Sequence, residues 1–305
     1  MKIKAFIAIL VGAVAFQNAS AGDWCPPVVE DKCPVDCCED LPGSVSVGYD
    51  TAYVWKGVRL AKDSMWGDVN YTFDIPYVGI PINVGVWHLT SLGSWPAAGT
   101  AGAPGNDNYG DETNVYASID LPSLCGFDHS VGYTWYTFPT LPVTGSSPDS
   151  FSGISYSISR EIYCGVTLGY TAEYFLGQGT AFNGALNPND SFGDWFHTLA
   201  LSKSFDITDC VALDLSAEVG YSDELQSGIG LTPRSGGLST GSGWNHYKLT
   251  AAVPLAVGRC ATLTPYISYN GTPDGWVADD LGVNLPVHSN RNDVFSGGVS
   301  LSVGF

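Results

Sequence analysis

The chain has 305 residues, of which 45% are hydrophobic, and it is rich in glycine (37), tyrosine (16) and tryptophan (9). Charged residues make up only 14%, against about 25% in an average soluble domain, and 30 Asp and Glu against 12 Lys and Arg give a formal net charge of −18. This composition argues against a helical bundle, and the shortage of Lys and Arg argues against a nucleic-acid partner, whose phosphates require them.

The N-terminal residues have the three parts of a secretory signal peptide. Lys2 and Lys4 give a positive start, residues 6–16 are apolar, and Ala19-Ser20-Ala21 is a small-residue cleavage site. No later run of 18 or more apolar residues offers a transmembrane helix. The exported chain is therefore either soluble outside the inner membrane or crosses a membrane as a β-barrel.

A short segment separates this signal from the rest of the chain. It spans residues 22–43 and contains four prolines, four cysteines and no strand pattern. We therefore predict a signal peptide at 1–21, a Cys/Pro-rich periplasmic segment at 22–43 and a single β-domain at 44–305.

Hydrophobic residues in the β-domain alternate with small polar ones. The last segment is apolar at its odd positions, which are Phe295, Val299, Leu301, Val303 and Phe305, and Ser or Gly fills the even positions between them. Segments 162–174 and 211–221 repeat the pattern. The polar face holds mostly Ser, Thr, Gly, Asn and Tyr, whereas a soluble sandwich would present Lys and Glu to water. Small polar residues inside and apolar residues outside are typical of a transmembrane barrel.

Twelve segments of this kind predict twelve strands, an even number as in bacterial single-chain barrels. We expect strands at 44–58, 65–74, 79–89, 112–121, 127–138, 150–159, 162–174, 194–205, 210–222, 243–253, 259–269 and 293–305. Short connections are expected at 75–78, 122–126, 160–161, 206–209 and 254–258, and long ones at 90–111, 139–149, 175–193, 223–242 and 270–292, with a short exception at 59–64. This alternation predicts an all-β, up-and-down antiparallel transmembrane barrel with short periplasmic turns and long extracellular loops.

Two stretches resemble known outer-membrane proteins. Residues 294–305 resemble the C-terminal signature of bacterial outer-membrane barrels, an alternating last strand that ends in an aromatic residue. This resemblance implies that the barrel-assembly machinery recognises Phe305, and it implies an outer-membrane location in a Gram-negative bacterium. The first strand, with the run Gly48-Tyr49-Asp50-Thr51-Ala52-Tyr53-Val54-Trp55-Lys56-Gly57-Val58, resembles the opening strand of small porins of the TorF-like type.

Eight cysteines in an exported chain indicate disulfides, because the periplasm is oxidising. Cys25, Cys33, Cys37 and Cys38 lie in the N-terminal segment, and Cys125, Cys164, Cys210 and Cys260 fall in or beside predicted short turns. Turns two strands apart are about 10 Å from each other, beyond the usual reach of a disulfide. One hypothesis is therefore that the segment lies across the periplasmic mouth and is bridged to the turns.

Three other uses of the cysteines stay open. Local pairs can form within the segment and between flexible turns. The cluster Cys33, Cys37 and Cys38 offers zinc ligands, although it lacks the paired Cys-x-x-Cys spacing. Intermolecular bridges into a covalent envelope layer are the third.

Extending the alternation inward gives candidate lumen and ion-selectivity residues. They are Asp50, Lys56, Asp68, Asp120, Glu173, Asp214, Glu218 and Lys248. Acids outnumber bases in this set, so a water-filled pore would favour cations. In the alternative interpretation these charges pair only to satisfy one another, with Lys56 and Lys248 each neutralising a neighbouring carboxylate, and the lumen is occluded.

No motif indicates catalysis, a cofactor or a resident metal. His88, His129 and His197 are interpreted as interfacial or rim residues. Acid pairs such as Asp111-Glu112 are placed in long loops, where weak cation binding or bridging to lipopolysaccharide is conceivable. Tryptophans near the loop-side ends of strands predict an aromatic girdle.

The sequence therefore predicts a porin-like channel, not an enzyme, for passive diffusion of small, preferentially cationic or neutral solutes. Its expected partners are outer-membrane lipid and lipopolysaccharide, the barrel-assembly machinery, the solutes and a second copy of the chain. The alternative function is a structural or adhesive, disulfide-linked envelope protein with an occluded lumen.

Overall fold

The structure is a computed structural model. It describes residues 42–61, 63–75, 79–92, 111–139, 149–177, 193–208, 210–223, 232–233, 242–258, 260–273, 276, 281–282 and 293–305. The predicted signal peptide and nearly all of the segment 22–43 lie outside these residues. None of the described residues forms a helix with the length and hydrophobicity needed to traverse a bilayer.

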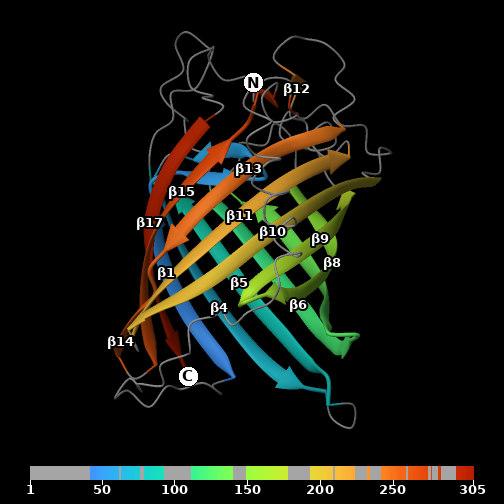
Figure 1. The fold of residues 1–305 in the computed structure, drawn as a ribbon. Coiled ribbons are helices and arrows are strands. Elements are labelled where there is room, and N and C mark those ends of the chain that lie inside the picture. The colour runs from blue at the N-terminus through green and yellow to red at the C-terminus, as the bar shows by residue number, and fades with distance from the viewer. Residues whose placement is uncertain are drawn as a thin grey trace, which may run out of the picture. The chain divides into compact units, whose positions relative to one another are not determined.

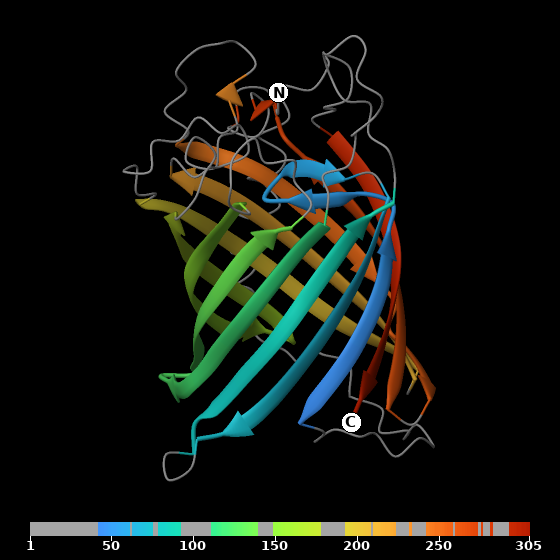
Figure 2. The same ribbon diagram turned by 180° about the vertical axis from the view of Figure 1, so that it is seen from behind.

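The described strands form a closed antiparallel barrel of twelve wall positions (Figures 1 and 2). In chain order these positions are β1 (Gly43–Asp50), β4 (Ser64–Asp74), β5 (Pro81–Ser91), β6 (Asp111–Leu124), β7 (Phe127–Phe138), β8 (Asp149–Tyr163), β9 (Val166–Gly177), β10 (Gly193–Thr208), β11 (Val211–Asp223), β13 (Gly243–Ala252), β15 (Ala261–Gly271) and β17 (Asp293–Gly304). Each strand pairs with the next, and β17 pairs with β1 to close the ring. The short β14 (Leu255–Gly258) follows β13 and pairs with both β11 and β15. The predicted fold class is confirmed.

The two faces of the wall differ as the alternation predicts. On β17, Phe295, Val299, Leu301 and Val303 are exposed on the outside. Between them, the Ser302 hydroxyl lies on the inner face, 2.9 Å from the hydroxyl of Ser46 on β1. A closed barrel with an apolar outer face satisfies every wall hydrogen bond and presents hydrocarbon-compatible side chains to lipid. The chain is therefore an outer-membrane β-barrel.

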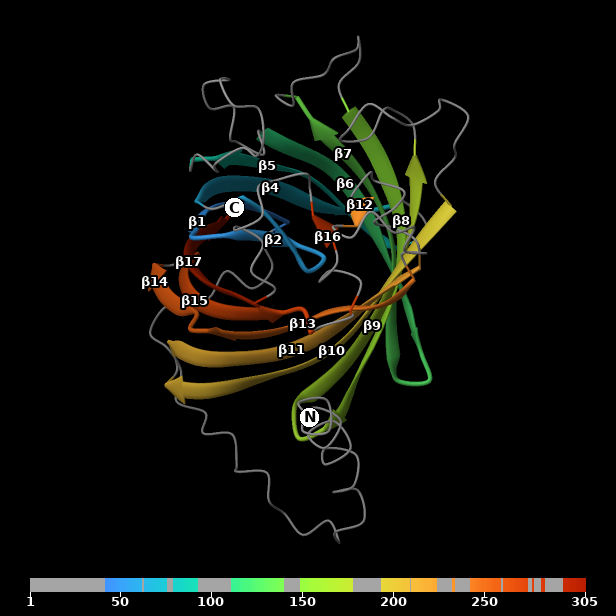
Figure 3. The same cartoon turned by 90° about the horizontal axis from the view of Figure 1, so that it is seen from above.

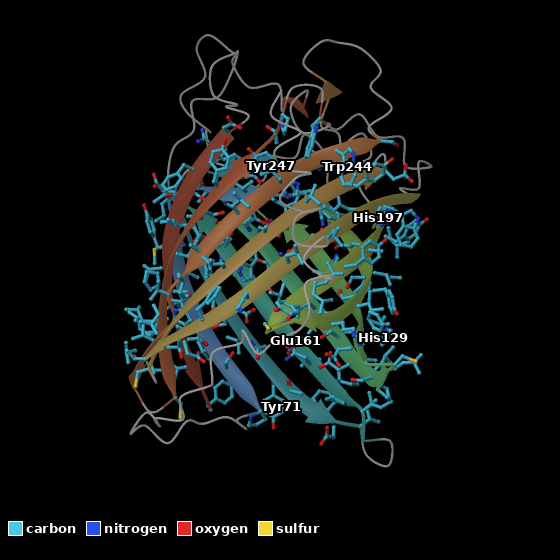
Figure 4. The ribbon with its side chains drawn as sticks, viewed as in Figure 1. Tyr71, His129, Glu161, His197, Trp244 and Tyr247 are labelled. Atoms are coloured by element: carbon cyan, nitrogen blue, oxygen red, sulfur yellow. The ribbon has the colours of Figure 1, made fainter. Side chains whose placement is uncertain are left out.

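Aromatic side chains border both ends of the outer face (Figure 4). Toward the long loops, Trp195, His197, Tyr221 and Trp244 follow one another across the wall with ring centroids 5.7–6.2 Å apart. Toward the short turns, the His129 ring lies beside Tyr156, and the two polar groups are 2.6 Å apart. Such amphipathic rings suit the boundary between hydrocarbon and headgroups.

Two predicted turns are in the wrong place. Arg160 and Glu161 lie within β8, and residues 255–258 form β14. Charged residues near a strand end reach the headgroup region, so hydrophilicity alone did not mark where the strand stops. The turn is instead Cys164-Gly165, with φ of 42° and 74°, and Cys125-Gly126 repeats it with 54° and 75°. Two positive φ values in a two-residue loop define a type I′ hairpin turn.

The largest difference from the prediction lies in the first strand. It was expected to run over residues 44–58, but β1 ends at Asp50. The chain then forms a separate hairpin of β2 (Tyr53–Trp55) and β3 (Val58–Ala61), so residues 59–64 are not a loop. Seen from above, β2 lies inside the outline of the wall (Figure 3). Two of the expected long loops also pair, through β12 (Thr232–Pro233) and β16 (Leu281–Gly282).

Candidate functional site: the lumen and its constriction

The hairpin β2–β3 turns into the barrel through a tight two-residue loop. Trp55 pairs with Val58, which leaves Lys56 and Gly57 at the tip with φ of 45° and 81°. This is again a type I′ turn, in which glycine is favoured at the second position. Lysine is not a preferred residue for the left-handed region, so contacts of the tip must hold it there.

Contacts with β13 and β15 hold the hairpin tip. The side-chain amide of Asn245 on β13 donates to the Lys56 carbonyl at 3.1 Å, and that of Asn270 on β15 donates to the Gly57 carbonyl at 3.4 Å. A Cβ at position 57 would lie 2.6 Å from the His246 Cβ. Glycine is therefore required at position 57 by its backbone conformation and by its approach to β13.

The Lys56 ammonium group is bound within an aromatic and acidic site. Its Nζ donates to Glu173 Oε2 at 2.7 Å, and both side chains are largely buried. The ring centroids of Phe196, Phe175 and Trp55 lie 4.2, 5.1 and 5.3 Å from the same nitrogen. Tyr136 donates to the other carboxylate oxygen, Oε1, at 2.8 Å. The predicted neutralisation of Lys56 by a carboxylate is thus present in the geometry.

Aromatic rings fill the lumen around this ion pair. The Trp55 ring lies 6.1–6.4 Å from the rings of Tyr136, Phe151 and Phe175. Tyr136 and Phe151 stack at 4.7 Å. Phe175 is only 1% exposed. The inner face of β7, β8 and β9 therefore forms a small hydrophobic core with the hairpin in place of an open water-filled surface.

A second anchor lies at the start of the hairpin. The Tyr53 hydroxyl donates to Glu112 Oε2 at 3.0 Å, and the Asn114 amide donates to Glu112 Oε1 at 2.8 Å. The Tyr53 ring also lies 5.8 Å from the Trp87 ring. Glu112 is 1% exposed and belongs to β6, so its placement in a solvated loop as one of an acid pair was wrong.

Three other predicted lumen carboxylates accept hydrogen bonds on the inner face. Tyr266 donates to Asp50 at 2.6 Å, and Tyr116 donates to Asp68 at 2.9 Å. Glu218 lies 3.1 Å from His246 Nε2. Lys248 stands opposite Glu218 in the register of β11 and β13, which places it on the same face.

Toward the short turns the inner face changes character. Asp120 alternates with the outward Leu121, and Asp214 alternates with the outward Leu215, so both acids face inward. Their register partners on neighbouring strands are Ser130 and Ser204. Small polar groups bond to one another across this part of the wall: Ser46 to Ser302, Asn70 to Ser44, Asn83 to Thr72 and Ser157 to Thr171.

The four cysteines predicted at turns all lie at the turn end of the barrel. Cys125 is exposed and its thiol is free, whereas Cys164, Cys210 and Cys260 are disulfide-bonded. The other four cysteines, and with them the possible zinc cluster, lie outside the described residues. In the part of the chain that the structure describes, no group of three or more metal-ligating side chains is present.

The hairpin was missed because its residues continue the strand pattern. Tyr53, Trp55 and Val58 are strand-forming types, and the segment was therefore interpreted as one extended strand. The sequence signal for the hairpin is the dipeptide Lys56-Gly57. It ends in glycine and lies between two strand-forming stretches, where a two-residue hairpin loop is expected.

Comparison with known proteins adds structural likenesses of the barrel. No family model matches the chain, and no curated protein matches it. The solved KdgM porin is 8% identical with a TM-score of 0.42, over 86% of this chain and 99% of that chain. The COG4313 outer membrane channel from Pseudomonas putida F1 is 11% identical with a TM-score of 0.48, over 90% and 99%. The assignment to outer-membrane barrels rests on the closed sheet and its apolar outer face, and the TorF-like resemblance stays a prediction.

Proposed function

We propose that the protein is a porin-like channel through which small, preferentially cationic or neutral solutes diffuse across the outer membrane. The observation that carries the proposal is the uneven charge of the inner face. Asp50, Asp68, Asp120, Glu112, Glu173, Asp214 and Glu218 face inward, against Lys56 and Lys248 among the predicted lumen bases. Low-dielectric walls strengthen the field of such carboxylates and raise the local cation concentration.

In the proposed channel the hairpin limits the size of the solutes that can pass. It crosses the lumen from β1 to contacts on β9, β13 and β15. A solute must pass beside it, because its tip is bound to the wall on several sides. Its ion pair also removes Lys56 as a free positive charge, so the remaining carboxylates determine the sign of the selectivity.

Planar-bilayer recording tests the proposal. We expect discrete conductance steps from the purified protein and, in a KCl gradient, a reversal potential of the sign that cation preference produces. Anion preference would contradict the proposed selectivity. An absence of conductance from the natural chain would contradict the channel itself.

One observation favours a second function. The aromatic layer around Trp55 fills part of the lumen, as a structural or adhesive envelope protein with an occluded barrel would require. In that case the natural protein conducts nothing and the chain without the hairpin conducts. The same recordings therefore separate the two functions.

A further proposal concerns the partner that assembles the barrel in the membrane. The Phe305 side chain is half exposed, and its N–H donates to the Gly43 carbonyl at 3.0 Å at the seam between β17 and β1. We expect the barrel-assembly machinery to recognise this end of the chain. Removing Phe305 should lower the amount of folded barrel in outer membranes, measured by the heat-dependent shift of its mobility in gels.

A further inference from the structure

The site that holds the Lys56 ammonium group belongs mostly to the barrel wall. Glu173 and Phe175 come from β9, and Phe196 on β10 stands directly opposite Glu173 in register. Of the three rings around the nitrogen, only Trp55 comes from the hairpin. The carboxylate and two of the three rings therefore belong to the wall, and the hairpin tip does not supply them.

These wall groups have the chemistry that recognises an organic ammonium ion. A carboxylate provides a charge-assisted hydrogen bond, and aromatic faces attract the cation through their quadrupoles. The hydrogen bond from Tyr136 fixes Oε1 and leaves Oε2 to accept from the ammonium. Gly153 leaves room for the carboxylate, because a Cβ there would lie 2.6 Å from Glu173 Oε1.

We infer that Glu173, Phe175 and Phe196 form a binding site for solutes with a primary ammonium group on an unbranched alkyl chain. In this structure Lys56 occupies that site as a tethered ligand. The inference rests on the proposed channel function and names the solute class for which the constriction is selective. A tethered group acts at an effective concentration in the millimolar range, so a solute binds only when it displaces Lys56.

Two substitutions at position 56 distinguish an emptied binding site from a site that has lost the lysine charge but is still filled by a side chain. Lys56→Ala removes the atoms of an n-propylammonium ion and leaves both space and an uncompensated carboxylate. Lys56→Met removes the charge but keeps a side chain in the space. We expect n-propylammonium to bind the Ala variant at least about tenfold more tightly than the natural protein, a ratio within the range of cation–π and ion-pair effects. The Met variant should show no gain.

Titration calorimetry of the folded barrel in detergent measures this affinity, and the concentration dependence of current block measures it again in bilayers. Adding Glu173→Gln to Lys56→Ala should abolish the gain, and propanesulfonate, of similar size and opposite charge, should not bind. Lys203→Ala is the matched control, because Lys203 Nζ also lies over a ring, that of Phe205 at 4.8 Å, but on the outer face.

Folding of each variant is checked by heat-dependent gel mobility. If Lys56→Ala does not fold, Lys56→Asn opens the same site and suits the type I′ turn. Equal affinities in the natural, Ala or Asn, and Met proteins would overturn the inference, as would a gain that survives Glu173→Gln. A protein that does not conduct but shows the predicted calorimetry would refute the channel and leave the ammonium site standing.

Discussion

The loop-end and turn-end halves of the lumen are built from the same strands but have different interiors. Near the loops, the inner face carries Tyr136, Phe151, Phe175 and Phe196, and these rings are buried by the hairpin. Near the turns, it carries serines, threonines and asparagines that bond to one another. The wall alone thus does not define the space inside the barrel, because a segment that leaves the wall occupies part of one half.

The difference also separates two kinds of lumen charge. Glu112 and Glu173 at the loop end are committed to Tyr53 and Lys56 of the hairpin. Asp120 and Asp214 at the turn end lie among small residues, where water can reach them. The first pair holds the hairpin in place, and in the proposed channel the second pair is exposed to ions in transit.

Removing the hairpin should have the largest effect, because it would make the two halves alike. Asp50 and Ser64 are register partners, so residues 51–63 can be replaced by Asn-Gly, which closes a two-residue turn between them. We expect single-channel conductance to rise severalfold while the barrel still folds. A deletion of equal length within residues 178–192, which connect β9 to β10, is the control, and an unchanged conductance on removing the hairpin would show that the hairpin does not limit flow.

Substitutions at two glycines, one at the hairpin tip and one in a short turn, allow the two halves to be compared by their effect on stability. Gly57 and Gly79 both have left-handed φ, 81° and 64°, but a Cβ meets His246 at position 57 and nothing within 4 Å at position 79. Gly79→Ala should lower the free energy of unfolding by about 1 kcal/mol. Gly57→Ala should lower it by about 2–4 kcal/mol, since a steric clash adds to the backbone cost. Urea unfolding followed by tryptophan fluorescence measures both, and equal losses would mean that the tip is not docked on β13.

Neutralising the acids of the turn end should give the smallest effect. Water and salt screen Asp120 and Asp214, so Asp120→Asn with Asp214→Asn should lower the ratio of cation to anion permeability by no more than about twofold. Reversal potentials at low and high salt measure this ratio, and the change should shrink at high salt. A larger drop that is insensitive to salt would mean that water and salt do not screen these two acids.

The periodicity of two predicted the wall because lipid and lumen impose opposite requirements on alternate residues. Strand β17 illustrates this, because its side chains from Phe295 to Val303 alternate between the lipid and the lumen. Where that requirement ends, the prediction failed. Arg160 and Glu161 lie at the membrane boundary, where both faces tolerate charge, and so the strand appeared to stop too early.

The constriction could not be predicted from the same rule. The contact between Lys56 and Glu173 joins residues 117 positions apart, and no local pattern relates them. Burial of Glu112 has the same cause, because its partner Tyr53 reaches it only after the chain leaves the wall. Parity predicts an inward direction for Asp50, Asp68 and Glu218, but their hydrogen-bond partners depend on the barrel closing.

The number of disulfide-bonded cysteines at the turn end limits how they can be paired. Cys164, Cys210 and Cys260 are three in number, and the remaining described cysteine, Cys125, has a free thiol. Pairing within an odd set leaves one member over, so at least one disulfide must leave this set, and of residues 22–43 and a second copy of the chain we expect residues 22–43 to supply its partner. Peptide mapping without reduction tests this by seeking a peptide of that segment joined to one of the three. Such a bond would make the chain from residues 22–43 to the middle of the barrel a single covalent loop.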